Sequence, residues 1–142
     1  MYIETKRLTV RTFRESDVEA LYKIKTDPQV REYIPDFLDL DAQSGDMVNF
    51  IRKFIQLEES NDTDTWRCYA IEKRETGEVM GCISFGKSEL LFEYELGWMM
   101  NGQHFGNGYA AEAAEAFAEY FCETHAIAMT TIISDDIIPN AR

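Results

Sequence analysis

Alternating apolar and polar residues predict β-strands in several parts of this chain, because successive side chains of a strand point to its two faces in turn. Residues 75–78, Glu-Thr-Gly-Glu, have the composition of a tight turn and would join two of these strands as a hairpin. A run rich in β-branched residues predicts a further, buried strand near the end of the chain. In chain order the predicted strands cover residues 8–13, 66–72, 79–85, 89–100 and 128–134.

Apolar residues three or four positions apart predict three helices. Ser16 and Glu19 have the spacing of a capping box, so the first helix would begin there and end at Pro28. The second covers residues 44–59, and the third, rich in alanine, covers residues 109–123. On the third helix the glutamates are assigned to an exposed face and the aromatic residues to the core: Glu112, Glu115, Glu119 and Glu123 against Phe117, Tyr120 and Phe121.

The order strand, two helices, three strands, helix, strand predicts an α/β (α+β) fold. Its sheet would be mixed and mostly antiparallel, with one βαβ unit over residues 90–134. Nothing in the composition marks a linker, so residues 1–142 are expected to form a single domain. The three cysteines, at positions 68, 82 and 122, are too widely spaced for a disulfide framework or a metal site. We expect buried, reduced thiols and no bound metal.

Acidic residues outnumber basic ones by 26 to 14, which gives a formal net charge of −12. Such an excess of acid argues against general nucleic-acid binding and against docking on anionic membranes, and it would attract a cationic substrate. No apolar run is long enough to span a bilayer, and the amino terminus lacks the basic and apolar regions of a signal peptide. Reduced thiols are typical of the cytoplasm, so this is the expected location.

The stretch from Asn101 to Gly108 holds three glycines in eight residues and connects a predicted strand to a predicted helix. The first N–H groups of a helix have no carbonyl partner, and glycines let an anion approach the backbone, so this loop could bind a phosphate or pyrophosphate. The alternative is an ordinary glycine-bearing connection. A dinucleotide fold is not favoured, because the loop follows an antiparallel meander, and a P-loop would need Lys-Ser or Lys-Thr after its last glycine.

Residues 95–113, from Glu-Leu-Gly-Trp-Met-Met through Gly-Asn-Gly-Tyr-Ala-Ala-Glu-Ala, resemble the acetyl-CoA motif of the GNAT N-acetyltransferase superfamily. The segment 3–11 and the acidic Asp17 resemble the opening of the branch that acetylates ribosomal-protein amino termini and related small amines. The superfamily pattern matches residues 103–108 literally, but the Gly-x-Gly-Tyr-Ala register of this branch, which places Phe105 at the Gln/Arg position, is preferred.

The resemblance implies a GNAT fold with a βαβ acetyl-CoA unit and an activity that moves an acetyl group from acetyl-CoA, the co-substrate, to a primary amine by direct attack. The acceptor would be a peptide amino terminus, a polyamine or another small amine. By the same resemblance Tyr33 would line the acceptor pocket, and packing in the core or on the surface is the alternative. The residues implied to contact the co-substrate are Trp98, Met99, Met100, Phe105, Gly106, Asn107, Gly108, Tyr109, Ala110 and Asn140.

Glu95 is the candidate catalytic base, acting through water, and Glu93 is its alternative, since residues 93, 95, 97 and 99 share one face of an ideal strand. Either glutamate could instead be a solvated strand residue or a contact for the charge of the substrate. By the resemblance, a backbone N–H of Met99 or Trp98 would hold the thioester carbonyl. A cysteine nucleophile is less favoured than core packing of the thiols.

Members of this family typically continue beyond the position of Arg142 with a serine, a helix and two strands, and a tyrosine there often protonates the leaving thiolate. The resemblance therefore predicts a carboxy-terminally truncated domain with an open strand edge at residues 128–134. A homo-oligomer that covers this edge, or an impaired enzyme, is expected. The alternative functions are a non-catalytic CoA-binding or oligomerisation module and an inactive fragment of a longer acetyltransferase.

Overall fold

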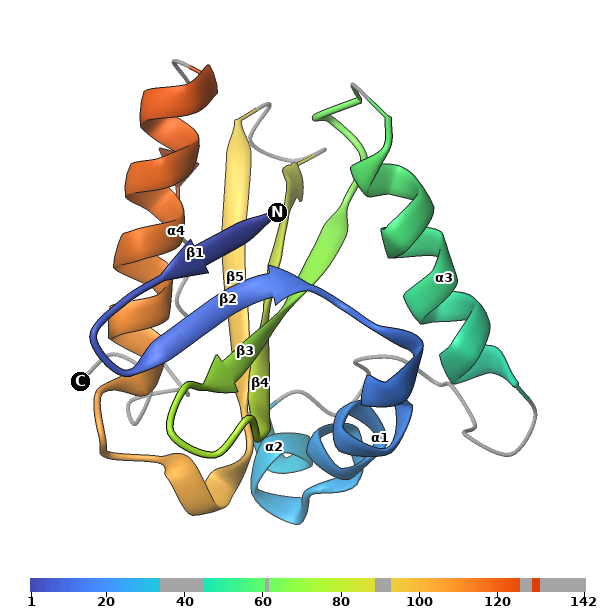
Figure 1. Cartoon of the computed structure of the whole chain (residues 1–142), viewed down its shortest axis with the longest axis vertical. Helices are drawn as coiled ribbons and strands as arrows, with labels where there is room; N and C mark the ends of the chain where they lie inside the picture. The colour runs from blue at the N-terminus through green and yellow to red at the C-terminus, as the bar shows by residue number, and fades with distance from the viewer. Residues whose placement is uncertain (34–44, 61, 89–92, 126–128, 131–142) are drawn as a thin grey trace.

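A computed structural model describes residues 1–33, 45–60, 62–88, 93–125 and 129–130. Within these residues, six strands form one sheet in the order β1-β2-β3-β4-β5-β6, which is also their order in the chain (Figure 1). Neighbouring strands are antiparallel except for β5 and β6, which are parallel. The strands are β1 Tyr2–Glu4, β2 Leu8–Thr12, β3 Arg67–Lys73, β4 Val79–Lys87, β5 Tyr94–Met100 and β6 Met129–Thr130.

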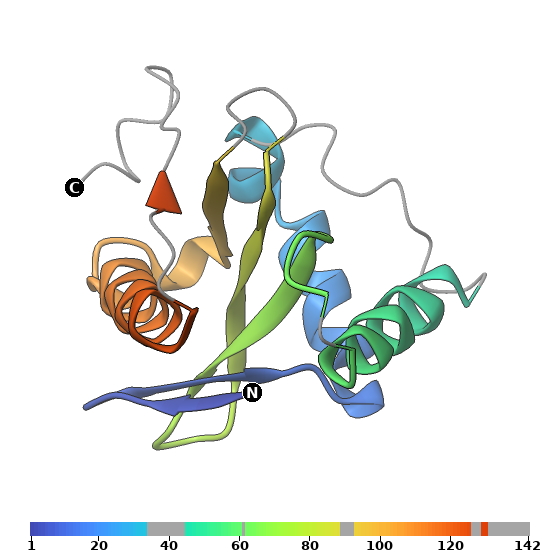
Figure 2. The same cartoon turned by 90° about the horizontal axis from the view of Figure 1, so that it is seen from above.

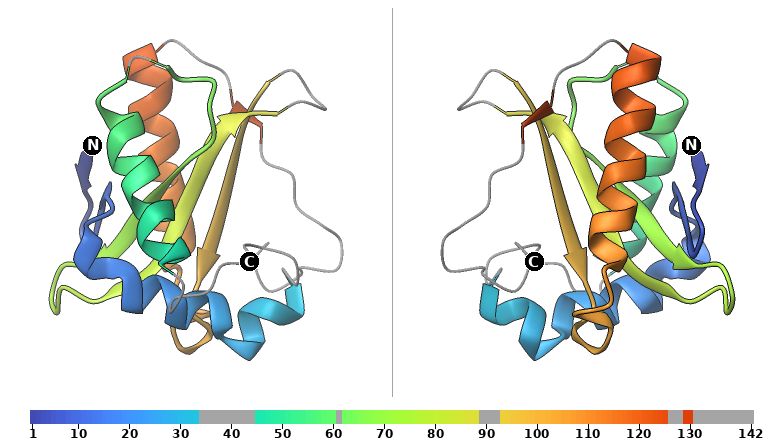
Figure 3. Two further views of the ribbon diagram at one scale, coloured as in Figure 1. Left: turned by 90° about the vertical axis from the view of Figure 1, so that its right-hand side faces the viewer. Right: turned by 90° about the vertical axis from the view of Figure 1, so that its left-hand side faces the viewer.

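Helices cover both faces of this sheet. The 3-10 helix η1 (Glu15–Asp17) leads into α1 (Val18–Thr26), and α2 (Pro28–Tyr33) and α3 (Asp46–Glu58) follow. The short η2 (Gly102–His104) and α4 (Tyr109–His125) come after β5. Figure 2 shows α4 on one side of the sheet and α1 and α3 on the other, and Figure 3 shows the same layers from the two sides.

Each face of the sheet carries its own apolar cluster. On the α4 side, Phe117 and Phe121 pack against side chains such as Leu8, Tyr69 and Phe85. On the opposite side, α1, α2 and α3 pack against the other face of the same strands. This second cluster contains Phe13, Leu21, Ile24, Val30, Met47, Ile51, Phe54, Cys68, Ala70, Cys82 and Met99. The strands of the sheet are therefore covered on both faces.

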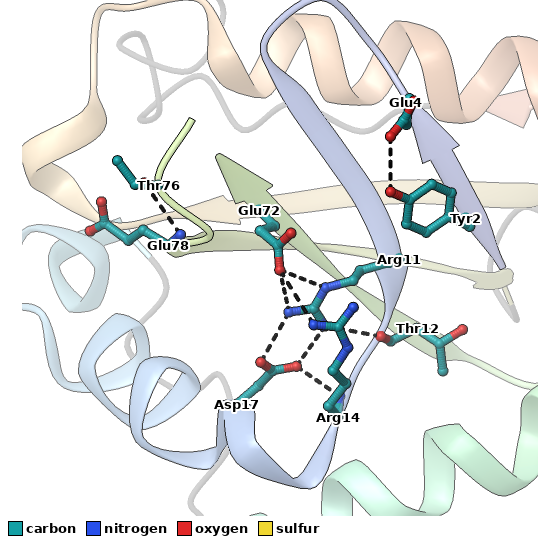
Figure 4. Close-up of polar contacts among 9 residues, drawn as sticks. All are labelled: Tyr2, Glu4, Arg11, Thr12, Arg14, Asp17, Glu72, Thr76 and Glu78. Atoms are coloured by element: carbon teal, nitrogen blue, oxygen red, sulfur yellow. Dashed lines mark hydrogen bonds and ion pairs between the residues drawn. The ribbon is translucent and has the colours of Figure 1, made fainter. Parts of the chain in front are cut away.

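A buried ion cluster joins η1 to the strands β2 and β3 (Figure 4). The guanidinium of Arg11, which is 3% exposed, donates to Asp17 at 2.8 Å and to Glu72 at 2.7 Å. Asp17 also accepts from the backbone N–H of Arg14 at 2.7 Å. A charge inside a protein is tolerated only when it is paired and hydrogen-bonded. These contacts hold the start of α1 against the sheet.

The mixed, mostly antiparallel sheet and the order of the main elements were predicted correctly, with two additions. The strand β1 has three residues, too few to show an alternating pattern. Pro28 ends the first helix as expected, but it also begins α2, since proline is well suited to the first turn of a helix. The predicted capping box of Ser16 and Glu19 is wrong: Ser16 lies within η1, and α1 begins after Asp17.

Three predictions about individual side chains are also wrong. Tyr120 is 38% exposed instead of lying in the core, although Phe117 and Phe121 are buried as expected. Cys122 is exposed, whereas Cys68 and Cys82 are buried thiols. Glu112 was expected on the exposed glutamate face, but its side chain is only 20% exposed and its carboxylate forms an ion pair with Arg7.

Candidate functional site

The loop after β5 is anchored to strand β4 and to the junction of α1 and α2. The N–H of Asn101 donates to the carbonyl of Met80 at 2.8 Å, and the N–H of Gly102 donates to the carboxylate of Asp27 at 2.7 Å. The side chain of Gln29 lies close over Gly102, since an added Cβ would come within 2.0 Å of its oxygen. The junction of α1 and α2 therefore sets where this loop begins.

The end of the loop exposes backbone N–H groups. Gly106 and Gly108 have φ angles of +75° and +73°, in the left-handed region that favours glycine. The bond from the N–H of Glu112 to the carbonyl of Gly108, at 3.1 Å, opens the hydrogen-bond ladder of α4. The N–H groups of residues 109–111, in the first turn of the helix, therefore have no helical carbonyl to donate to.

Space is available in front of these groups. Residues 106–108 are exposed, and a Cβ added at Gly106 would meet no atom within 4 Å. The side-chain amide of Asn107 donates to the carbonyls of His104 and Phe105, both at 3.1 Å, which holds the loop in this shape. An open, preformed row of N–H groups at the positive end of a helix dipole is suited to a phosphate or diphosphate.

Arg7 and Glu112 stand beside this loop, and sequence reasoning assigned neither of them to the site. The Nε of Arg7 donates to Glu112 Oε2 at 2.6 Å, and the Nη1 donates to the carbonyl of Asn107 at 2.9 Å. Burial acts to raise the pKa of Glu112, but hydrogen bonds from Thr5 and Arg7 outweigh it and hold the pKa below the ordinary value. The local pattern could not show this pair, because its members lie 105 positions apart.

The outer edge of β5 is open over most of its length within the described residues. Along one edge, β5 pairs with β4 from Tyr94 to Met100. Along the other edge, β6 pairs only with Tyr94 and Glu95. The expected pantetheine contacts at Trp98, Met99 and Met100 fall on the part of the edge without a described strand partner. The side chains of Trp98 and Met100 pack in the cluster with α4, and that of Met99 packs in the opposite cluster. A ligand along this edge would therefore contact their backbone groups.

The two candidate bases differ in their surroundings. Glu95 is half-buried within β5, opposite Gly86 of β4 and Thr130 of β6. Glu93 is exposed and precedes the strand, where its carbonyl accepts from the N–H of Ser88 at 2.8 Å. Glu95 therefore has the more constrained position, on the same face of the strand as Met99.

The remaining candidates are placed as follows. Phe105 and Ala110 are half-buried and pack against the α4 cluster, and Tyr109 opens α4 beneath the guanidinium of Arg7, 4.5 Å from its ring centroid. Tyr33 is the last residue of α2; the structure describes its place in the helix only. Asn140 lies outside the described residues, as does most of the strand expected at 128–134.

The buried thiols are poorly suited to nucleophilic chemistry. A hydrogen bond to Cys82 and burial together raise the pKa of the Cys68 thiol well above its ordinary value, so it stays protonated. In the described part of the chain, no three His, Cys, Asp or Glu side chains gather as a metal site. No helix among those described is long and apolar enough to cross a membrane.

The sequence as a whole matches a known family of proteins. Residues 7–136 match the family model described as acetyltransferase (GNAT) domain. The uncharacterised N-acetyltransferase YnaD of Bacillus subtilis (strain 168) is 32% identical over 145 residues, which cover 100% of this chain and 78% of YnaD.

Solved structures share the fold. A GNAT-family acetyltransferase from Bacillus anthracis superimposes with a TM-score of 0.80 at 26% identity, over 100% of this chain and 79% of its own. RimL, a ribosomal L7/L12 alpha-N-protein acetyltransferase solved with coenzyme A, superimposes with a TM-score of 0.71 at 16% identity, over 92% and 73%. The match to the family model covers most of the chain, and we conclude that this protein belongs to the GNAT acetyltransferases, the N-acetyltransferase class of acyltransferases.

Proposed function

We propose that this protein transfers the acetyl group of acetyl-CoA to a primary amine, and that residues 105–110 bind the diphosphate of the co-substrate. The observation that carries the proposal is the pair of left-handed glycines, Gly106 and Gly108, which open the start of α4 to an anion. The coenzyme A complex of RimL, which shares the fold, supports the choice of ligand. Bound acetyl-CoA would supply the acetyl group as an activated thioester.

The chain's own residues would then orient the co-substrate and accept a proton. The backbone of Trp98, Met99 and Met100, on the edge of β5 that has no strand partner among the described residues, would hold the pantetheine arm, with an N–H of Met99 or Trp98 toward the thioester carbonyl. Glu95 would accept the proton of the attacking amine through water. As the new C–N bond forms, the C–S bond of the thioester would break, and coenzyme A would leave as its thiolate and take up a proton from solvent. Direct attack by the amine is favoured over an acyl-enzyme, because Cys68 and Cys82 are buried and the pKa of Cys68 is raised by its hydrogen bond to Cys82 and by burial.

The acceptor is proposed to be a cationic amine, such as a peptide amino terminus or a polyamine, that enters on the side of Tyr33. The formal charge of −12 supports a cationic acceptor, since a negative surface concentrates cations around the protein. A homo-oligomer and a cytoplasmic location stay predictions.

Calorimetric titration with coenzyme A tests the co-substrate site. Wild-type protein is expected to bind one equivalent. Gly108→Ala should weaken binding about tenfold or more, because it adds a methyl group and strain where the N–H groups face the ligand. Gly45→Ala is the matched control: Gly45 has a φ of +80°, and a Cβ added there would meet no atom within 4 Å, but it lies at the start of α3.

Two results would count against the proposal. A folded wild-type chain that does not bind coenzyme A would refute the site, and equal loss of affinity in both glycine variants would show that the loop has no special part in binding. Coenzyme A binding without acetylation of any amine in a panel would favour the alternative of a non-catalytic CoA-binding module.

A further inference from the structure

Arg7 lies in the connection between β1 and β2, yet its side chain reaches the loop that begins α4. Two of its guanidinium nitrogens are engaged there: Nε with Glu112 at 2.6 Å and Nη1 with the carbonyl oxygen of Asn107 at 2.9 Å. The third, Nη2, would lie 3.7 Å from a Cβ built on Gly108. The planar guanidinium also covers the ring of Tyr109. Arg7 therefore contacts three of the residues from 107 to 112.

We propose that Arg7 is a positioning residue of the co-substrate loop, which neutralises Glu112 and holds the Asn107 carbonyl away from the diphosphate. This inference rests on the proposed function, since it concerns how the same loop is prepared for its ligand. Arg7 acts through Asn107 and Glu112 and needs no contact with the acceptor or the acetyl group.

The orientation of one peptide plane carries the first step. In a trans peptide the carbonyl oxygen and the following N–H point in opposite directions. The hydrogen bond to Arg7 turns the carbonyl of Asn107 toward the β1–β2 connection, so the N–H of Gly108 points the other way, out of the loop. With a φ of +73°, Gly108 has the freedom to adopt other backbone conformations when this contact is lost.

The charge of Glu112 carries the second step. A carboxylate in the first turn of a helix is stabilised by the helix dipole, but it would repel a diphosphate that binds at the same helix end. Here the carboxylate accepts from the side chain of Thr5 at 2.6 Å, from the N–H of Arg7 at 3.0 Å and from the Arg7 guanidinium. The β1–β2 connection thus holds this negative charge in an ion pair and a set of hydrogen bonds.

A set of four proteins tests the inference by coenzyme A calorimetry: wild type, Arg7→Met, Arg7→Met/Glu112→Gln and Arg52→Met. Arg52 is the matched control, because it forms an ion pair of similar length with Glu15, 2.7 Å, on the exposed surface between α3 and η1. Arg7→Met is expected to weaken coenzyme A binding about tenfold, since it leaves a carboxylate uncovered beside the site. Arg52→Met should bind as the wild type does.

The double variant separates positioning from a merely structural role. If Arg7 neutralises Glu112, removing the carboxylate as well restores much of the affinity, although the double variant has lost more contacts than the single one. In steady-state assays the single variant should raise KM for acetyl-CoA and leave kcat nearly unchanged. Arg7→Lys, which keeps the charge, serves as the second variant if Arg7→Met does not fold, and it should bind more weakly than wild type and improve little when Glu112→Gln is added.

The outcomes distinguish this inference from the proposed function. Wild-type protein that fails to bind coenzyme A refutes the proposed function, and the inference falls with it. Wild-type binding together with unchanged affinity in Arg7→Met overturns the inference alone. No recovery in the double variant, or a loss in Arg52→Met as large as in Arg7→Met, also overturns it.

Discussion

Arg11 is the residue on which the packing of the first helical segment most depends. Its guanidinium is almost fully buried and pairs with two carboxylates, Asp17 and Glu72, from different elements. Truncating one member of a buried ion cluster is costly mainly because the remaining charges are left without partners. A paired charge on the surface contributes far less, because water already solvates both groups.

Arg11→Met is therefore expected to lower the free energy of unfolding by about 3–5 kcal/mol. Arg52→Met removes an exposed ion pair with Glu15 and should change the free energy of unfolding far less than Arg11→Met does. Urea denaturation of both variants at neutral pH measures the difference. Equal costs would show that the Arg11 cluster contributes no more to stability than a surface pair.

Glu95 is the residue on which the proposed chemistry most depends. Glu95→Gln keeps the shape of the side chain but cannot accept a proton, so kcat should fall about 10²-fold or more with little change in KM for acetyl-CoA. Glu93→Gln, on the exposed bend before the strand, is the control and should retain most of the activity. A larger loss of kcat in the Glu93 variant than in the Glu95 variant would assign the role of the base to Glu93.

At the scale of elements, the close pairing of β4 with β5 sets the position of the co-substrate edge. Gly81 of β4 lies opposite Met100, and a Cβ there would come within 2.3 Å of the carbonyl oxygen of Met99. Gly97 of β5 lies opposite Ser84, and a Cβ there would meet only the hydroxyl of that serine, at 2.8 Å. The first clash is with backbone and the second with a side chain that can rotate.

Gly81→Ala should therefore lower the free energy of unfolding by about 2–3 kcal/mol or more, because the strands must separate to admit the methyl group. Gly97→Ala is the matched variant in the same strand pair and should cost clearly less. The urea midpoints of the two proteins provide the comparison. Similar midpoints would mean that β4 yields at Gly81 without disturbing its pairing.

At the scale of the whole molecule, one sheet connects two apolar clusters. The same strands contribute to both: in β3, Tyr69 packs toward α4, while Ala70 packs toward the opposite helices. Separation of these strands would therefore expose the apolar side chains of both clusters to water. This arrangement supports the proposal that residues 1–142 form a single domain.

The expected consequence is one cooperative unfolding transition. Trp98 packs against the α4 cluster and Trp66 is 39% exposed, so a Trp66→Phe protein would report on the α4 side by fluorescence. Its urea curve should coincide with the curve from far-UV circular dichroism, which follows all helices. Two separated transitions would contradict the single-domain proposal.

Local patterns in the sequence were sufficient for most of the elements and for the candidate loop. Short apolar runs bounded by turn residues predicted the strands from β2 to β5, and apolar side chains at every third to fourth position predicted the helices α3 and α4, because both signals lie in neighbouring residues. The glycines of the loop and the start of α4 at Tyr109 follow from local backbone requirements. The resemblance added the family, which the comparison with known proteins confirms.

Contacts between distant residues were decided only by the tertiary structure. Arg7 meets Asn107 and Glu112 across 100 and 105 positions, and Arg11 meets Glu72 across 61. No local pattern distinguishes Glu112 from the other glutamates of α4, because all of them lie at helical spacing. Which one pairs with Arg7 depends on how the sheet brings remote segments together. The sequence thus determined the elements and the loop, whereas the fold determined the charges that surround them.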